Sequence, residues 1–119
     1  MTTRPNQLDG PTYRVTLGDG SRMYVTINEH NGKPFEVFAR YDDADKYEWL
    51  GALTTMITRL LRAGQPLEQI GKELLEIHGP ESSHMIPGTR EMAPSIVARI
   101  GRVFVNHPKN FNSNHEVAA

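Results

Sequence analysis

The sequence contains no cysteine. This absence excludes disulfide bonds, thiolate nucleophiles, thiolate zinc sites and thiol redox chemistry. The glycine-rich dinucleotide loop and the Walker sequence, two common phosphate-binding motifs, are also missing. No apolar run approaches the roughly 20 residues that span a bilayer, and the first residues lack the apolar core of a signal peptide. We therefore expect a cytoplasmic protein without membrane contacts.

The chain also lacks an excess of charge of either sign, with a formal net charge of −1. We expect no DNA binding, because no basic field would attract nucleic acid. A discrete protein partner or a small ligand remains compatible, since balanced charge excludes only non-specific attraction. The length of 119 residues favours one domain. We place it at residues 11–105, between a flexible N-terminus (1–10) and a flexible polar tail (106–119).

The N-terminal third of the chain carries three strand patterns. Residues 12–17 and 22–28 alternate apolar and polar side chains, which is the period of a strand with one buried face. Glycines in the loop at 18–21 can supply positive φ for a hairpin. Asn31-Gly32 is the dipeptide preferred in a type I′ turn, and a third strand follows at about 34–40. We predict three antiparallel strands joined in sequence order, a β-meander.

After Tyr41 the apolar period changes from two residues to 3.6. Gly64 is placed to end a first helix as a left-handed cap, and Pro66 and Pro94 suit the first positions of two more. Strands followed by helices predict an α+β fold, in which three helices cover one face of the three-stranded antiparallel sheet. We expect no strand C-terminal to residue 45. The expected helices lie near residues 44–63, 66–78 and 94–105.

Several segments follow the sequence pattern of a known family and together span about residues 4–104. The most specific is the hairpin segment Gly32-Lys33-Pro34-Phe35-Glu36-Val37-Phe38. The others are Arg4-Pro5, Leu8-Asp9-Gly10-Pro11-Thr12-Tyr13, Tyr24-Val25-Thr26-Ile27-Asn28-Glu29, Leu60-Leu61-Arg62-Ala63-Gly64 and the stretch from Ile70 to Ile77. On these segments the chain resembles the TSCPD domain, which is named for a Thr-Ser-Cys-Pro-Asp motif. That domain is found near the C-terminus of adenosylcobalamin-dependent (class II) ribonucleotide reductases and also as small stand-alone proteins.

The motif that names the family is altered here. In its place the chain has Glu91-Met92-Ala93-Pro94-Ser95, so the proline survives and the cysteine is lost. The sequence also lacks the family's catalytic barrel, with its radical-generating cofactor site and substrate cysteines. The resemblance therefore implies a shared fold and a shared partner, but not ribonucleotide reduction by this chain. We expect no enzyme activity, no cofactor and no bound metal.

The leading candidate site is the sheet face that the helices leave uncovered. If Phe35 and Val37 face the helices, alternation sends Glu36 and Phe38 to the outer face. Aromatic rings among polar groups of both signs fit a partner-binding surface, and they fit equally an ordinary solvated face with cross-strand ion pairs. A homodimer is the simplest way to cover such a face. The candidate residues on it are Arg14, Thr16, Tyr24, Thr26, Asn28, Glu36, Phe38 and Arg40.

The long loop after the second helix offers weaker candidates. His78 and His84 flank this loop, but their spacing fits no metal motif, so we interpret them as exposed loop histidines. Within the loop (79–92), Met85-Ile86 either covers the core or inserts into a partner.

The leading functional interpretation is a non-catalytic accessory or regulatory module that acts through protein contacts, with a ribonucleotide reductase as a candidate partner. One alternative is a stand-alone nucleotide-binding or small-ligand-binding protein. Arg59 and Arg62, on one helix stripe, could then hold a phosphate or carboxylate, although a solvated face is the default for such a stripe. Another alternative is an inhibitor of some other enzyme, encoded by a mobile element.

Overall fold

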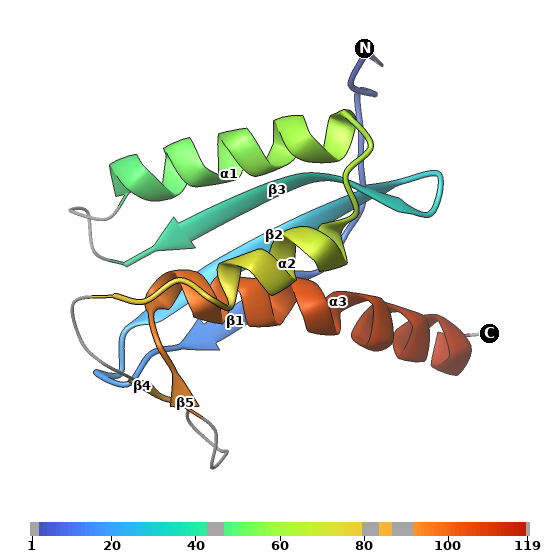
Figure 1. Cartoon of the computed structure of the whole chain (residues 1–119). Helices are drawn as coiled ribbons and strands as arrows, with labels where there is room; N and C mark the ends of the chain where they lie inside the picture. Colours follow the sequence, from blue (N-terminus) through green and yellow to red (C-terminus); the bar gives the residue numbers. More distant parts are fainter. Residues whose placement is uncertain (1–2, 43–46, 80–83, 87–91, 119) are drawn as a thin grey trace.

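The computed structural model describes residues 3–42, 47–79, 84–86 and 92–118 (Figure 1). It confirms the α+β fold, with three N-terminal strands in one sheet and three helices after them. The elements in chain order are β1 (Thr12–Thr16), β2 (Arg22–His30), β3 (Lys33–Tyr41), α1 (Tyr47–Arg62), α2 (Leu67–Leu74), β4 (His84–Met85), β5 (Met92–Ala93) and α3 (Ile96–Ala118).

The sheet is antiparallel, in the order β1-β2-β3. Tyr13 lies opposite Val25, and Thr26 lies opposite Phe38, which fixes the register of both pairs of strands. The second turn has positive φ at both central residues, 53° at Asn31 and 76° at Gly32, as a type I′ turn requires. The β-meander predicted from the alternating pattern is therefore confirmed.

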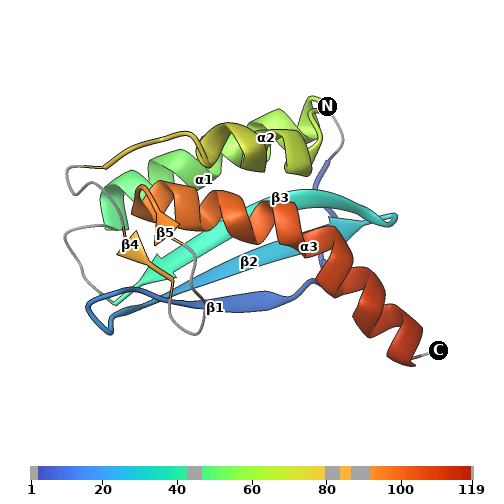
Figure 2. The ribbon, with the colours of Figure 1, turned by 60° about the horizontal axis from the view of Figure 1, so that its bottom comes forward.

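The inner face of the sheet packs against all three helices. Apolar residues of β1 and β2 point inward at alternate positions, and Met23, Val25 and Ile27 are fully buried. In the two views α2 and α3 lie side by side across this face, while α1 runs alongside β3 (Figures 1 and 2). The buried residues of this core are Val15, Leu17, Met23, Val25, Ile27, Val37, Tyr41, Leu50, Ile57, Leu61, Leu67, Ile70, Ile100 and Phe104.

Helix α1 also closes the outer edge of the sheet. The Val37 N–H donates to Thr58 Oγ1 at 3.1 Å, and the same hydroxyl donates to the Val37 carbonyl at 3.3 Å. An edge strand otherwise presents unpaired backbone groups to a neighbouring chain. One threonine on α1 thus satisfies both backbone groups of Val37, on the side of β3 away from β2.

Glycines let α2 and α3 approach each other closely. A Cβ added to Gly101 would lie 2.6 Å from the Gly71 carbonyl oxygen, and one added to Gly71 would lie 2.8 Å from that of Gly101. Both glycines are buried. Small residues at a helix contact allow such backbone approach, and any larger side chain would separate the helices.

The structure corrects several expected boundaries. The strands β4 and β5 lie C-terminal to residue 45, where no strand was expected; they are short and pair with each other, closing the long loop. The second helix ends at Leu74 instead of residue 78, and the third continues to Ala118, through most of the segment predicted to be a tail. Pro66 and Pro94 precede their helices and are not their first residues. Among the described residues, no helix is long and apolar enough to cross a membrane.

Part of the long loop packs against the start of α3, beside the main core. Ile86 is buried and forms a small second cluster with Ala93 and Ala98. Of the two predicted roles, burial within the protein therefore fits Ile86 better than insertion into a partner. The side chain of Met85 lies outside the described residues.

Candidate functional site

A buried carboxylate organises one end of the sheet. Glu36, on β3, accepts hydrogen bonds from Arg4 Nε and Arg4 Nη2, each at 2.8 Å, and from Asn28 Nδ2 at 2.8 Å. Arg62 Nη2 lies 3.9 Å from its second oxygen. The Arg4 hydrogen bonds, with smaller contributions from Asn28 and the nearby positive charges, hold the pKa of Glu36 below its ordinary value against the opposing effect of burial. A two-pronged arginine contact of this kind is among the stronger ion pairs in proteins.

This burial corrects the expectation that Glu36 belongs to an open partner surface. The side chain points outward as the alternation predicts, yet the residue is only 1% exposed. The reason is the N-terminal segment, which the sequence analysis expected to be flexible. Its Asp9 carbonyl accepts from the Glu29 N–H at 2.9 Å, and the Pro11 carbonyl accepts from Ile27 at 3.1 Å.

The path of that segment depends on Gly10. A Cβ at this position would lie 1.9 Å from the Ile27 carbonyl oxygen, so a side chain cannot be accommodated there. Because the backbone at Gly10 passes close to β2, the N-terminal segment extends the line of β1 alongside β2. Arg4, further toward the N-terminus, then reaches Glu36 on β3. Arg4 was not among the predicted site residues, because nothing in the local sequence pattern indicates a contact 32 positions away.

The rest of the outer face is open and carries aromatic rings between cations. In one cross-strand row Tyr24 lies between Arg14 and Arg40, and the Arg40 guanidinium carbon is 5.2 Å from the Tyr24 ring centre. In the next row Phe38 is 53% exposed. A hollow of about 330 Å³ lies over these rows and is lined by Thr12, Tyr24, Thr26, Phe38, Ala39 and Arg40.

Most predicted partner residues are thus brought together, and we refer to Arg14, Tyr24, Thr26, Phe38 and Arg40 as the outer-face patch. Asn28 is not counted in this patch, because its side-chain amide donates a hydrogen bond to the buried Glu36. Thr16 points to the same face of the sheet as the patch, but it lies at the end of β1, opposite Arg22. That the patch binds a partner remains a prediction.

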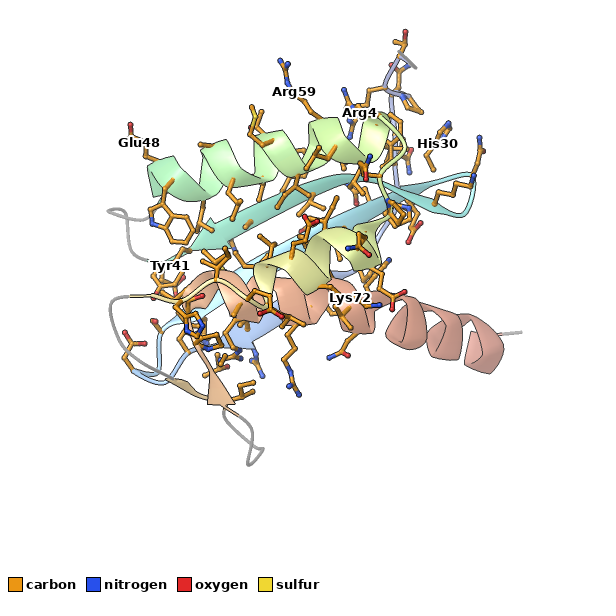
Figure 3. The ribbon with its side chains drawn as sticks, in the orientation of Figure 1. Arg4, His30, Tyr41, Glu48, Arg59 and Lys72 are labelled. Atoms are coloured by element: carbon orange, nitrogen blue, oxygen red, sulfur yellow. The ribbon has the colours of Figure 1, made fainter. Side chains whose placement is uncertain are left out.

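The predicted pair Arg59 and Arg62 lines a second hollow, of about 390 Å³, between α1 and β3. Arg62 lies 4.7 Å above the Phe35 ring, and its Nη2 atom lies 3.9 Å from the carboxylate of Glu36, which it shares with Arg4. Arg59 is exposed and points away from the sheet (Figure 3). The hollow also contains Arg4 and Phe38. It is therefore a mixed-charge groove that adjoins the outer-face patch.

A buried polar chain that the sequence analysis missed joins α3 to the sheet. Tyr13 Oη lies 2.7 Å from His107 Nδ1, and His107 Nε2 lies 2.5 Å from Glu29 Oε1. Burial, and then the charge of Glu29, raises the pKa of Tyr13. His107 is 1% exposed, although its position falls in the segment predicted to be a flexible tail. The tail prediction is therefore wrong at this residue. The sequence signal that could have indicated the burial of His107 was Phe104, one helical turn earlier on the same apolar stripe.

The segment at the altered motif begins α3. Ser95 Oγ accepts the Ala98 N–H at 2.9 Å and donates to the Ile77 carbonyl at 2.6 Å. Serine and aspartate are both good N-cap residues. The residue that stands where the motif has aspartate thus keeps the capping function, while Ala93, where the motif has cysteine, is buried against Ile86 and Ala98.

A family model described as TSCPD domain matches residues 1–108. The chain belongs to the TSCPD family. This membership relates it to the C-terminal domain of ribonucleotide reductases, as the sequence resemblance implied. No curated protein and no solved structure matches the chain.

The TSCPD fold gives no metal centre in the part of the chain that the structure describes. Within that part, no three side chains of histidine, aspartate or glutamate lie close enough to hold an ion. His78 is exposed, and the side chain of His84 lies outside the described residues.

Proposed function

We propose that this TSCPD protein is a non-catalytic accessory module whose outer-face patch binds an acidic segment of a partner protein. The observation that supports the proposal is the exposure of Phe38, beside the row in which Tyr24 lies between two arginines. Aromatic residues and arginine are enriched in the centres of protein interfaces.

The patch has enough apolar area to contribute to binding. At 53% exposure, Phe38 leaves roughly 100 Å² for a partner to cover. At ~25 cal/mol per Å², that area is worth about 2.5 kcal/mol before the entropic cost of association. Tyr24, which is half-buried, adds a smaller amount.

The charge of the patch indicates the chemistry of the partner. Phe38, Arg40 and Glu36 each lie at the β3 end of a cross-strand row on this face. The only carboxylate in these three rows is that of Glu36, and Arg4 already neutralises it. Arg14 and Arg40 therefore leave the patch positive, which favours a partner that presents carboxylates. A two-fold homodimer through this face would bring arginines toward arginines, which disfavours self-association here.

Family membership suggests where to find the partner. Relatives of this domain form the C-terminal part of ribonucleotide reductases, so the catalytic part of such an enzyme is the first candidate. A regulatory role would follow from binding there. The absence of cysteine supports a role without redox chemistry.

The test is a binding titration between the purified chain and a ribonucleotide reductase from the same genome, at low and high salt. We expect binding that weakens as salt rises, and that falls about tenfold or more in the Phe38→Ala and Arg40→Gln variants. Met56→Ala is the matched control, because Met56 is 54% exposed but lies on α1, outside the patch.

Two outcomes would contradict the proposal. One is reductase binding that is unchanged in both patch variants. The other is a homodimer of the chain alone, detected by sedimentation and dissociated by Phe38→Ala, which would assign the patch to self-association.

A further inference from the structure

A second cluster of arginines lies between α3 and β1, two elements that pass each other in Figure 2. The two elements border an open pocket of about 170 Å³. Among the described residues that line it, three are arginines and none is acidic. The lining residues are Tyr13, Arg14, Val15, Arg99, Arg102, Val103 and Asn106.

Arg99 is the least expected member of this cluster, because it is buried. The residue is 7% exposed, and its Nη1 atom has no hydrogen-bond partner among the described residues. Burial lowers the pKa of Arg99. A buried guanidinium is normally paired with an anion, since an unpaired buried charge costs several kcal/mol. The arrangement is that of a site whose anion is supplied by a ligand.

The edge of the sheet adds a backbone donor. The Leu17 N–H bonds the Ser21 carbonyl and the Ile27 N–H bonds the Pro11 carbonyl, so odd-numbered residues of this segment pair with β2. In an antiparallel ladder the alternate residues then point their backbone groups away from that neighbour. The N–H of Arg14 is accordingly directed to the free edge of β1, where the pocket lies.

We propose that this pocket binds the phosphate group of a small molecule. Guanidinium groups present paired N–H donors that match phosphate oxygens. The buried Arg99 brings one such group to the lining of the pocket, and Arg102, one turn later on the same helix, also lines it. Tyr13 stands at the inner wall with its hydroxyl held by His107. A pocket of about 170 Å³ accommodates a single phosphate group, and the remainder of a larger ligand would extend into solvent.

This site is independent of the proposed protein interface. It differs from the groove of Arg59 and Arg62, whose described lining includes the carboxylate of Glu36. Only Arg14 is shared with the outer-face patch, so the test relies on Arg99 and Arg102. The source of the phosphate, free or attached to a nucleoside, is resolved by the choice of probe.

The first experiment measures binding of inorganic phosphate, AMP and adenosine to the full chain by calorimetry. We expect phosphate and AMP to bind and adenosine not to bind. AMP binding at least tenfold tighter than phosphate would identify a nucleotide as the ligand, and equal affinities would identify the phosphate group alone. The proposal is overturned if neither phosphate-bearing probe binds, or if adenosine binds as tightly as AMP.

The second experiment assigns the binding to this pocket. Arg99→Met should weaken AMP and phosphate binding at least tenfold, while the melting temperature without ligand stays unchanged or rises, because a buried unpaired charge is removed. Arg102→Gln, at a partly exposed position, should weaken binding in the same direction if Arg99→Met does not fold. Arg59→Gln, in the other arginine cluster, is the matched control and should bind as the wild type does. Wild-type affinity in Arg102→Gln, or loss of affinity in Arg59→Gln, would refute the assignment.

Discussion

The contact between α2 and α3 gives the sharpest prediction about stability. Replacing Gly101 by alanine puts a methyl group 2.6 Å from the Gly71 carbonyl oxygen and 3.0 Å from the Leu75 nitrogen. Both neighbours are backbone atoms, so a side-chain rotation cannot relieve the clash and the helices must separate. Overpacking of this kind typically costs about 1–3 kcal/mol.

Helix propensity acts in the opposite direction. Alanine is favoured over glycine inside a helix by about 1 kcal/mol, so part of the strain at Gly101 is offset. We expect a net loss of up to roughly 2 kcal/mol, or a melting temperature lower by up to about 10 °C for a domain of this size. Urea unfolding followed by circular dichroism measures it.

The chain contains a matched control for this prediction. Gly51 lies within α1, is exposed, and has no atom within 4 Å of an added Cβ. Gly51→Ala should therefore stabilise the protein by about 0.5–1 kcal/mol through propensity alone. The reasoning is refuted if Gly101→Ala stabilises the protein as much as Gly51→Ala does.

Three further predictions concern the polar contacts. Folding lowers the pKa of Glu36 from 4.5. The ionised Glu36 network therefore stabilises the protein above pH 4.5, and this stabilisation is lost as the pH falls through the lower pKa of the folded state. Glu36→Gln should show a weaker loss of stability on acidification below pH 4.5, and an unchanged pH profile would argue against the network. Tyr13→Phe should cost about 1–2 kcal/mol in urea unfolding, because it leaves buried His107 Nδ1 without its partner, and a neutral result would count against that hydrogen bond. Ser95→Ala should destabilise by about 1 kcal/mol or more, while Ser95→Asp keeps the cap and should cost less; equal losses in thermal melts would show that capping is not what Ser95 contributes.

Local periodicity was sufficient to predict the sheet. The alternation around Val15 and Val25 determined which residues face the core, and Asn31-Gly32 determined the second turn. It was also sufficient to place Tyr24 and Phe38 on the outer face. These features depend on neighbours in sequence, which a pattern can report.

The site features that were missed depend on contacts distant in sequence. Arg4 reaches Glu36 across 32 positions, and Tyr13 reaches His107 across 94. The burial of Arg99 depends on how α3 lies beside β1, which the helical period does not specify. Composition even misdirected the prediction at His107, because the polar residues after Val105 suggested a tail where the helix continues.

The hydroxyl of Thr58 has a consequence for how copies of this protein could associate. Because it hydrogen-bonds both backbone groups of Val37 on the outer side of β3, and α1 runs along that edge, a strand from another molecule would join the sheet more readily at β1. Two molecules that paired β1 to β1 would each present a capped β3 outward. Strand addition through β1 would therefore favour a closed pair over an open-ended stack of native sheets.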